Sequence, residues 1–166
     1  LSIYITKTPW VAILLVFISK WRTFAVRPRF WLANVKSNLV DLIFSLSIVI
    51  LMFSTGIDYI FSQGLLLALY IFWLTIIKPS SKELFVQVQA LFTVFFGFSA
   101  LYSIAYGWNE ALIFILAFLL GYSTIRHIIS SYADLNIEIF SLFWGLIVAE
   151  FAWIFNFLVI GYRINF

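Results

Sequence analysis

Long apolar runs separated by short polar segments dominate the pattern of hydrophobic and polar positions along the chain. Five of these runs are Leu39 to Thr55, Ile60 to Ile77, Leu84 to Tyr106, Ala111 to Tyr132 and Ile139 to Gly161. A helix needs about 17 to 25 apolar residues to cross a bilayer, and each run reaches or approaches that length. A β-barrel would alternate apolar and polar residues instead. The pattern predicts an all-α fold, a polytopic integral membrane helix bundle with five transmembrane helices.

A shorter apolar run, Trp10 to Ile18, lies near the start of the chain. Thr8 and Pro9 precede it, a favourable N-cap residue followed by proline in the first turn, so we expect a helix here. Its nine residues, at about 1.5 Å each, would cover about half of a 30 Å hydrocarbon core. With residues 1–5 added it would cross, provided that Lys7 reaches the outer interface. The sequence leaves open whether this N-terminal helix spans the membrane or is half inserted.

The connections between the runs are short and polar, as in the segments 56–58 and 78–81. Short connections make successive spans antiparallel neighbours, and they leave no room for a soluble domain. We therefore expect residues 1–166 to form a single membrane domain. Residues 1–36 would supply the N-terminal helix and an interfacial segment, and residues 37–166 the helical bundle.

Basic and aromatic residues are interleaved in the segment before the first full-length run. They are Lys20, Trp21, Arg22, Arg27, Arg29, Trp31 and Lys36. Aromatic rings and cations at headgroup depth are typical of a membrane interface, where the cations meet lipid phosphates. Two interpretations remain open: a binding site for anionic lipid, and a topology anchor without a specific ligand.

The distribution of Lys and Arg orients the predicted bundle. Of the 10 basic residues, eight fall in the loops around residues 20–36, 78–83 and 126–138, which successive crossings bring to one side. The opposite turns carry Asp58 and Glu110. Because Lys and Arg accumulate in cytoplasmic loops, the three basic loops are predicted to be cytoplasmic in a multi-pass protein of the cell membrane.

The composition narrows the function classes. The chain is 64% hydrophobic and 10% charged, whereas soluble domains are about 45 to 50% apolar and about 25% charged. It has no Cys and one His, which excludes thiolate metal sites and gives no support to paired-histidine zinc sites. It has no phosphate-binding loop or nucleophile motif, so no cofactor is indicated and an enzyme is not supported. The basic residues lie beside apolar runs, which does not favour nucleic acid as a partner.

Glu150 is the most informative single residue, because it lies near the middle of the last apolar run. A charged centre at that depth costs about 2.5 to 3.5 kcal/mol on insertion scales, so we expect its carboxyl group to point into the bundle towards a polar partner. Arg126 and His127 complete the candidate buried polar site, although Arg126 has alternative partners in Glu138 and lipid phosphates. Asp41, at a span start, is explained by its favourable position against the helix dipole.

Small residues recur every four positions in the last two runs. They are Ala117 and Gly121 in one run, and Ser141, Gly145 and Ala149 in the other. Small side chains at this spacing let helix backbones approach closely. We therefore expect these two spans to pack against each other as a tight hairpin.

Two function hypotheses follow from the sequence. The first is transport of a small molecule, ion or proton, or a transport-coupled subunit, in which the Glu150 carboxyl group acts inside the membrane. The second is a non-catalytic scaffold or assembly subunit that binds partner helices, further copies of the chain or anionic lipid. An integral membrane enzyme acting on lipid is a third, without a motif in its favour. A cavity that reaches Glu150 would favour transport over the scaffold.

Overall fold

The computed structural model describes residues 14, 16–21, 25, 27–55, 60–80, 82–105, 108–132 and 136–163, and of residues 60 and 156–163 it describes the backbone alone. The regular structure of these residues is helical throughout, as expected. The elements are α3 (Pro28–Ser37), α4 (Leu39–Ser54), α5 (Ile60–Phe72), the π-helix η1 (Trp73–Ile77), α6 (Glu83–Ile104), α7 (Glu110–Ser130) and α8 (Ile137–Arg163). Residues 16–21 are also helical, but most of the first apolar run lies outside the described residues, and with it the question of whether that run spans.

Local sequence signals explain several of the helix ends. Pro28 occupies the start of α3, where its missing N–H costs nothing. Asn109 caps α7, because its side chain accepts a hydrogen bond from the backbone N–H of Ala111 at 2.8 Å. Glu83 and Glu110 lie in the first turns of α6 and α7, where a negative charge meets the positive end of the helix dipole.

Three helices are long and apolar enough to cross a membrane, namely α6, α7 and the Ile137–Phe155 part of α8. The count rises to four if α3 and α4, which are bent by 70° relative to each other, form one broken span. This is fewer than the five spans that the sequence predicts. The difference arises because α4 has 16 residues and because α5 with η1 makes only a short apolar helix, Phe61–Ile77.

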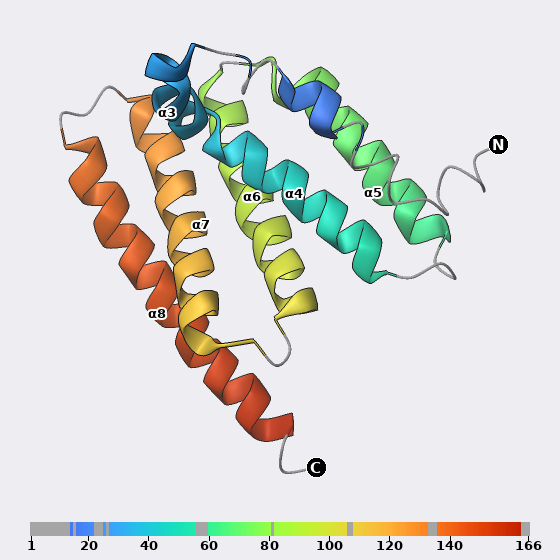
Figure 1. Ribbon diagram of the computed structural model, residues 1–166, viewed down its shortest axis with the longest axis vertical. Helices are drawn as coiled ribbons and strands as arrows, with labels where there is room; N and C mark the ends of the chain where they lie inside the picture. Colours follow the sequence, from blue (N-terminus) through green and yellow to red (C-terminus); the bar gives the residue numbers. More distant parts are fainter. Residues whose placement is uncertain are drawn as a thin grey trace.

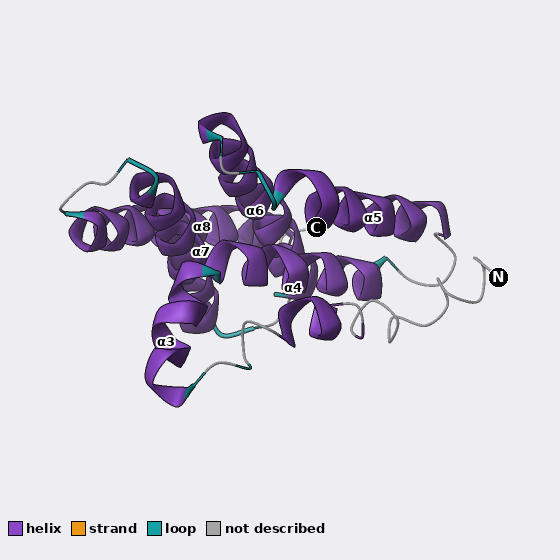
Figure 2. Ribbon diagram, turned by 90° about the horizontal axis from the view of Figure 1, so that it is seen from above, coloured by secondary structure: helices purple, strands orange, loops and turns teal. Residues whose placement is uncertain are grey.

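The helices form an elongated bundle in which α7 lies beside α8 and α6 lies beside both α4 and α7 (Figure 1). Helices α7 and α8 form one flank, α5 forms the other, and α4 and α6 lie between them, an arrangement that is also clear from above (Figure 2). Large apolar side chains cover the outward faces, with exposed fractions of 56 to 83% at Leu46, Phe61, Leu91, Phe143 and Phe151. Apolar surface on this scale indicates contact with lipid or with other protein.

Aromatic packing holds α4, η1 and α6 together. The rings of Phe44 and Trp73 are stacked with centroids 3.9 Å apart, and Phe96 of α6 meets Phe44 edge-on at 5.7 Å. Both Phe44 and Trp73 are at most 1% exposed. Burial of this much aromatic surface fixes η1 against the start of α4.

Small residues form the contact between α7 and α8. Ala117, Ser141 and Ala149 are 0% exposed, and Gly121 and Gly145 are buried as well. A Cβ atom on Gly121 would lie 2.6 Å from the Cβ of Val148, and one on Gly145 would lie 3.2 Å from the backbone oxygen of Phe118. The two helices therefore approach too closely at these points for larger side chains.

Candidate functional site

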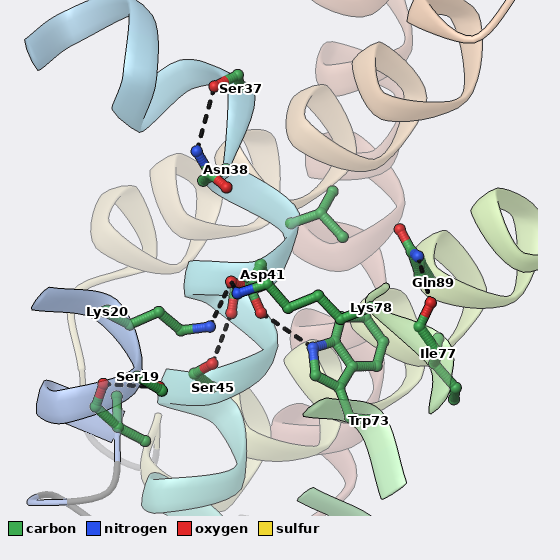
Figure 3. Close-up of polar contacts among 12 residues, drawn as sticks. Ser19, Lys20, Ser37, Asn38, Asp41, Ser45, Trp73, Ile77, Lys78 and Gln89 are labelled. Carbon is green, nitrogen blue, oxygen red and sulfur yellow. Dashed lines mark hydrogen bonds and ion pairs between the residues drawn. The ribbon is translucent and has the colours of Figure 1, made fainter. Parts of the chain in front are cut away.

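Buried charged groups meet at the first turn of α4, around Asp41 (Figure 3). Lys20, from the helical segment 16–21, is 2% exposed and forms an ion pair with the Asp41 carboxylate. Lys78, just after η1, places its Nζ 2.8 Å from the same oxygen, Oδ2. Trp73 donates its indole N–H to the other oxygen, Oδ1, at 3.0 Å. One carboxylate thus joins three separate parts of the chain.

Neutral hydrogen bonds surround this ion-pair cluster, which we define as Lys20, Asp41, Trp73 and Lys78. The Ser45 hydroxyl donates to the backbone oxygen of Asp41 at 2.7 Å, and the Tyr70 hydroxyl lies 2.9 Å from the Ser19 hydroxyl. A buried ion pair is favourable only where close geometry and further hydrogen bonds repay the loss of hydration. Lys78 and the Trp73 indole supply the further contacts of the Asp41 carboxylate, and the cluster ties the segment 16–21 and η1 to α4.

A polar cavity of about 240 Å³ lies between the α3–α4 junction and α7. Its polar lining comes from two cationic side chains, one imidazole and three hydroxyl groups, and two apolar side chains complete the wall. The lining residues are Lys36, Ser37, Leu39, Val40, Ser123, Arg126, His127 and Ser130. We call this space the polar cavity. It brings together Lys36 from the interfacial segment with Arg126 and His127 from the end of α7.

Glu138, at the start of α8, organises the cations of the polar cavity. Its Oε1 lies 2.6 Å from Lys36 Nζ and 3.3 Å from Arg126 Nε, while its Oε2 accepts a hydrogen bond from the Tyr122 hydroxyl at 2.6 Å. The Arg126 guanidinium also donates from Nη1 to the backbone oxygen of Lys36 at 3.4 Å. One carboxylate therefore faces two cations, and a guanidinium group offers five N–H donors in all. The cation pair retains capacity for a further anion.

His127 is held by an amide in a defined orientation. Its Nε2 lies 2.7 Å from Gln89 Oε1. The Gln89 side-chain nitrogen donates to the backbone oxygen of Ile77 at 2.8 Å, which fixes the amide so that its oxygen faces the imidazole. Because an amide oxygen only accepts, Nε2 carries the proton, and in the neutral ring Nδ1 is an acceptor. The same amide links the polar cavity on α7 to the end of η1.

The structure separates Glu150 from the other two members of the predicted buried site. Glu150 is exposed, whereas Arg126 and His127 are half-buried in the wall of the polar cavity. The expectation that Glu150 points into the bundle is wrong for the single chain. The physical reason is the packing of α8, which buries the face carrying Ala149 and Ala152 against α7. A residue one position from Ala149 is turned by about 100° from that face.

The predicted lipid-interface residues take different positions. Trp21, Arg27, Arg29 and Trp31 are exposed, and Arg22 lies outside the described residues. Lys20 belongs to the ion-pair cluster, and Lys36 lines the polar cavity. The importance of Asp41 was missed, because its place in a first turn seemed to explain it. The sequence did contain a clue to this cluster. Lys20 and Lys78 were both predicted on the same side of the membrane as Asp41, which lies at the start of its span.

The polar cavity has the chemistry of a binding site. The Lys36 and Arg126 side chains suit a phosphate or carboxylate group, which accepts charge-assisted hydrogen bonds from Arg and Lys. The hydroxyl groups of the lining already donate to backbone oxygens of their own helices. Within the described residues, no group of three or more His, Cys, Asp or Glu side chains is arranged to hold a metal ion. Comparison with family models, curated proteins and solved structures finds none that matches this chain.

Proposed function

We propose that this protein is an integral membrane protein that binds an anionic phosphate or carboxylate group in the polar cavity. The observation that carries the proposal is the convergence of the Lys36 and Arg126 cations on one cavity, where a single carboxylate, that of Glu138, faces both. Arg presents a planar fork that matches phosphate and carboxylate oxygens, and Lys adds a compact positive charge. The ligand is a lipid headgroup or a soluble anion with the same chemistry.

The proposed membrane topology has five crossings and places the polar cavity at the cytoplasmic face. The 16 residues of α4, at about 1.5 Å each, give about 24 Å of helix. A helix a few ångströms short of a 30 Å core is accommodated by local thinning and by flanking side chains that reach the interface. In Figure 1, α3, the end of η1, the end of α7 and the start of α8 lie at the same end of the bundle. The three basic loops therefore share one side, as the positive-inside rule requires of cytoplasmic loops.

The binding proposal is favoured over transport through a buried carboxyl group. Glu150, on which the transport hypothesis rests, is exposed, and Asp41 is already engaged by Lys20 and Lys78. Neither carboxyl group lines the polar cavity. The proposal therefore develops the second hypothesis from the sequence, a non-catalytic membrane protein that binds anionic lipid.

Loss of the Arg126 charge tests the binding site. Arg126→Gln is expected to weaken binding of phosphatidylglycerol by roughly 10- to 100-fold, because a hydrogen bond to a charged group contributes about 1.5 to 3 kcal/mol. Native mass spectrometry of the protein in mixed micelles would measure retention of phosphatidylglycerol against phosphatidylcholine. Glycerol phosphate added as a competitor separates a soluble anion from a lipid headgroup.

Arg29→Gln is the matched control. Arg29 is an exposed interfacial arginine whose guanidinium lies 4.8 Å from the ring of Phe30, and it does not line the polar cavity. Its loss is expected to leave phosphatidylglycerol retention nearly unchanged. Equal losses in both variants would mean that the protein attracts anionic lipid by general charge, and the proposed site would be rejected.

The proposed orientation has a direct test, because the chain contains no cysteine. A single cysteine at Trp108, in the turn before α7, is expected to react with a membrane-impermeant maleimide in intact cells. A single cysteine at Ser80, in the turn after η1, is expected to react only after the membrane is permeabilised. The opposite pattern would invert the topology.

A further inference from the structure

A second cavity, of about 270 Å³, lies between α4, α6 and α7 and is almost entirely apolar. Its wall includes Leu39 and Ser47 of α4, Gly97 of α6, and Leu116, Leu119 and Leu120 of α7. The Ser47 hydroxyl donates to the backbone oxygen of Ile43 at 2.8 Å, so its hydrogen is already engaged. We call this space the apolar groove. Its surface matches a hydrocarbon chain and offers little to a polar ligand.

The polar cavity and the apolar groove occupy successive turns of the same two helices. Leu39 lines both spaces. On α7, residues 123–130 line the polar cavity and residues 116–120 line the apolar groove, and the same order holds along α4. The lining therefore changes from cationic to apolar with increasing depth from the end of the bundle that carries α3. A phospholipid has the same order of charge and hydrocarbon along its length.

We infer that the ligand of the polar cavity is a single anionic phospholipid, with its phosphate beside Lys36 and Arg126 and one acyl chain along the apolar groove. This inference rests on the proposed function and names its substrate class. The headgroup distinguishes anionic lipids from neutral lipids that carry the same chains, whereas the groove adds van der Waals packing along one chain, the kind of contact that drives association inside a bilayer. The groove determines where the bound chain lies, and it favours a lipid over a soluble anion of equal charge.

Filling the apolar groove tests the position of the chain. Ser47 is 4% exposed and faces the groove, so Ser47→Phe would place a ring in the space assigned to the chain. Ser47→Phe is expected to lower phosphatidylglycerol retention several-fold in mixed micelles. Ser99→Phe is the matched control: the Ser99 hydroxyl makes the same kind of bond, to the Phe95 backbone oxygen at 2.8 Å, and Ser99 does not line the groove. Unchanged retention in Ser99→Phe is expected.

A measurement on the wild-type chain keeps the inference testable if Ser47→Phe does not fold. Phosphatidylglycerols with chains of increasing length, at equal mole fraction in the micelle, are expected to bind with rising affinity until the groove is filled. Equal affinity for dihexanoyl and dioleoyl forms would overturn the inference, as would equal retention in Ser47→Phe and Ser99→Phe. If either of these two results is found but Arg126→Gln still loses phosphatidylglycerol, the anion site stands and only the position assigned to the acyl chain is wrong. If Arg126→Gln retains it as well as wild type does, the proposed function itself fails.

Discussion

Asp41→Asn is expected to lower the free energy of unfolding by about 3 to 5 kcal/mol, the usual cost of removing one partner of a buried ion pair. The wild-type carboxylate compensates Lys20, which is 2% exposed, and also contacts Lys78 at 2.8 Å. A neutral amide would leave these two cations facing each other without a counter-charge. Thermal unfolding of the purified protein in detergent, followed by circular dichroism, measures the loss.

Glu110→Gln is the matched control for that substitution. Glu110 also lies in the first turn of a helix and accepts an indole N–H, from Trp153 at 3.2 Å, but it is exposed. Its neutralisation is expected to change stability by less than about 1 kcal/mol, because exposed charges contribute little. Comparable losses in the two variants would show that Asp41 acts only through the helix dipole. Lys20→Met added to Asp41→Asn is expected to restore part of the stability, because it removes an uncompensated charge.

Gly121→Leu is expected to destabilise the chain by about 1 to 3 kcal/mol or more, through overpacking between α7 and α8. Even the first atom of the new side chain would lie 2.6 Å from Val148 Cβ, well inside van der Waals contact. The neighbouring helix must then move outward along the contact that Ala117 and Ala149 also form. Thermal unfolding and resistance to dodecyl sulfate both report the change.

Gly64→Leu separates crowding from the general effect of replacing a helical glycine. Gly64 lies in α5, and a Cβ atom there would meet nothing within 4 Å. Leu has a better helix propensity than Gly by up to about 1 kcal/mol, so this variant is expected to be neutral or slightly stabilised. Val148→Ala combined with Gly121→Leu is expected to recover part of the loss. Failure of Gly121→Leu to differ from Gly64→Leu would contradict the close approach of the two helices.

Features that depend on residues near one another in the sequence could be predicted from it. The helical fold followed from the apolar runs, and the small residues of α7 and α8 lie in the contact between those helices. The run from Leu39 to Thr55 predicted the bounds of α4, Leu39–Ser54, but not its sharp bend from α3, and three or four helices, not five, are long and apolar enough to cross a membrane. The four-residue spacing of small residues predicted which faces of α7 and α8 meet.

The composition of the candidate site was harder to predict, because it depends on which distant residues meet. Lys36, Arg126 and His127 had been assigned to different roles, and only the packing of α7 beside the α3–α4 junction makes them one cavity. The prediction for Glu150 was wrong because it rested only on the cost of placing a charge in lipid. That cost implies that the carboxyl group needs a polar partner, but it does not imply that the partner lies within the same chain. The position of Glu150 directly after Ala149 did indicate that its side chain points away from the helix face that packs against α7.

The ion-pair cluster also sets an order of assembly during synthesis. Lys20 and Asp41 leave the ribosome early, whereas Lys78 and Trp73, which contact the same carboxylate, follow only after α5 has been made. A nascent chain that ends at residue 55 therefore contains the Lys20–Asp41 pair but neither of the other contacts. The helical segment 16–21 acquires its complete docking site on α4 only once η1 packs beside it. This segment is thus made before α4, α5 and η1 but is locked in place only after them.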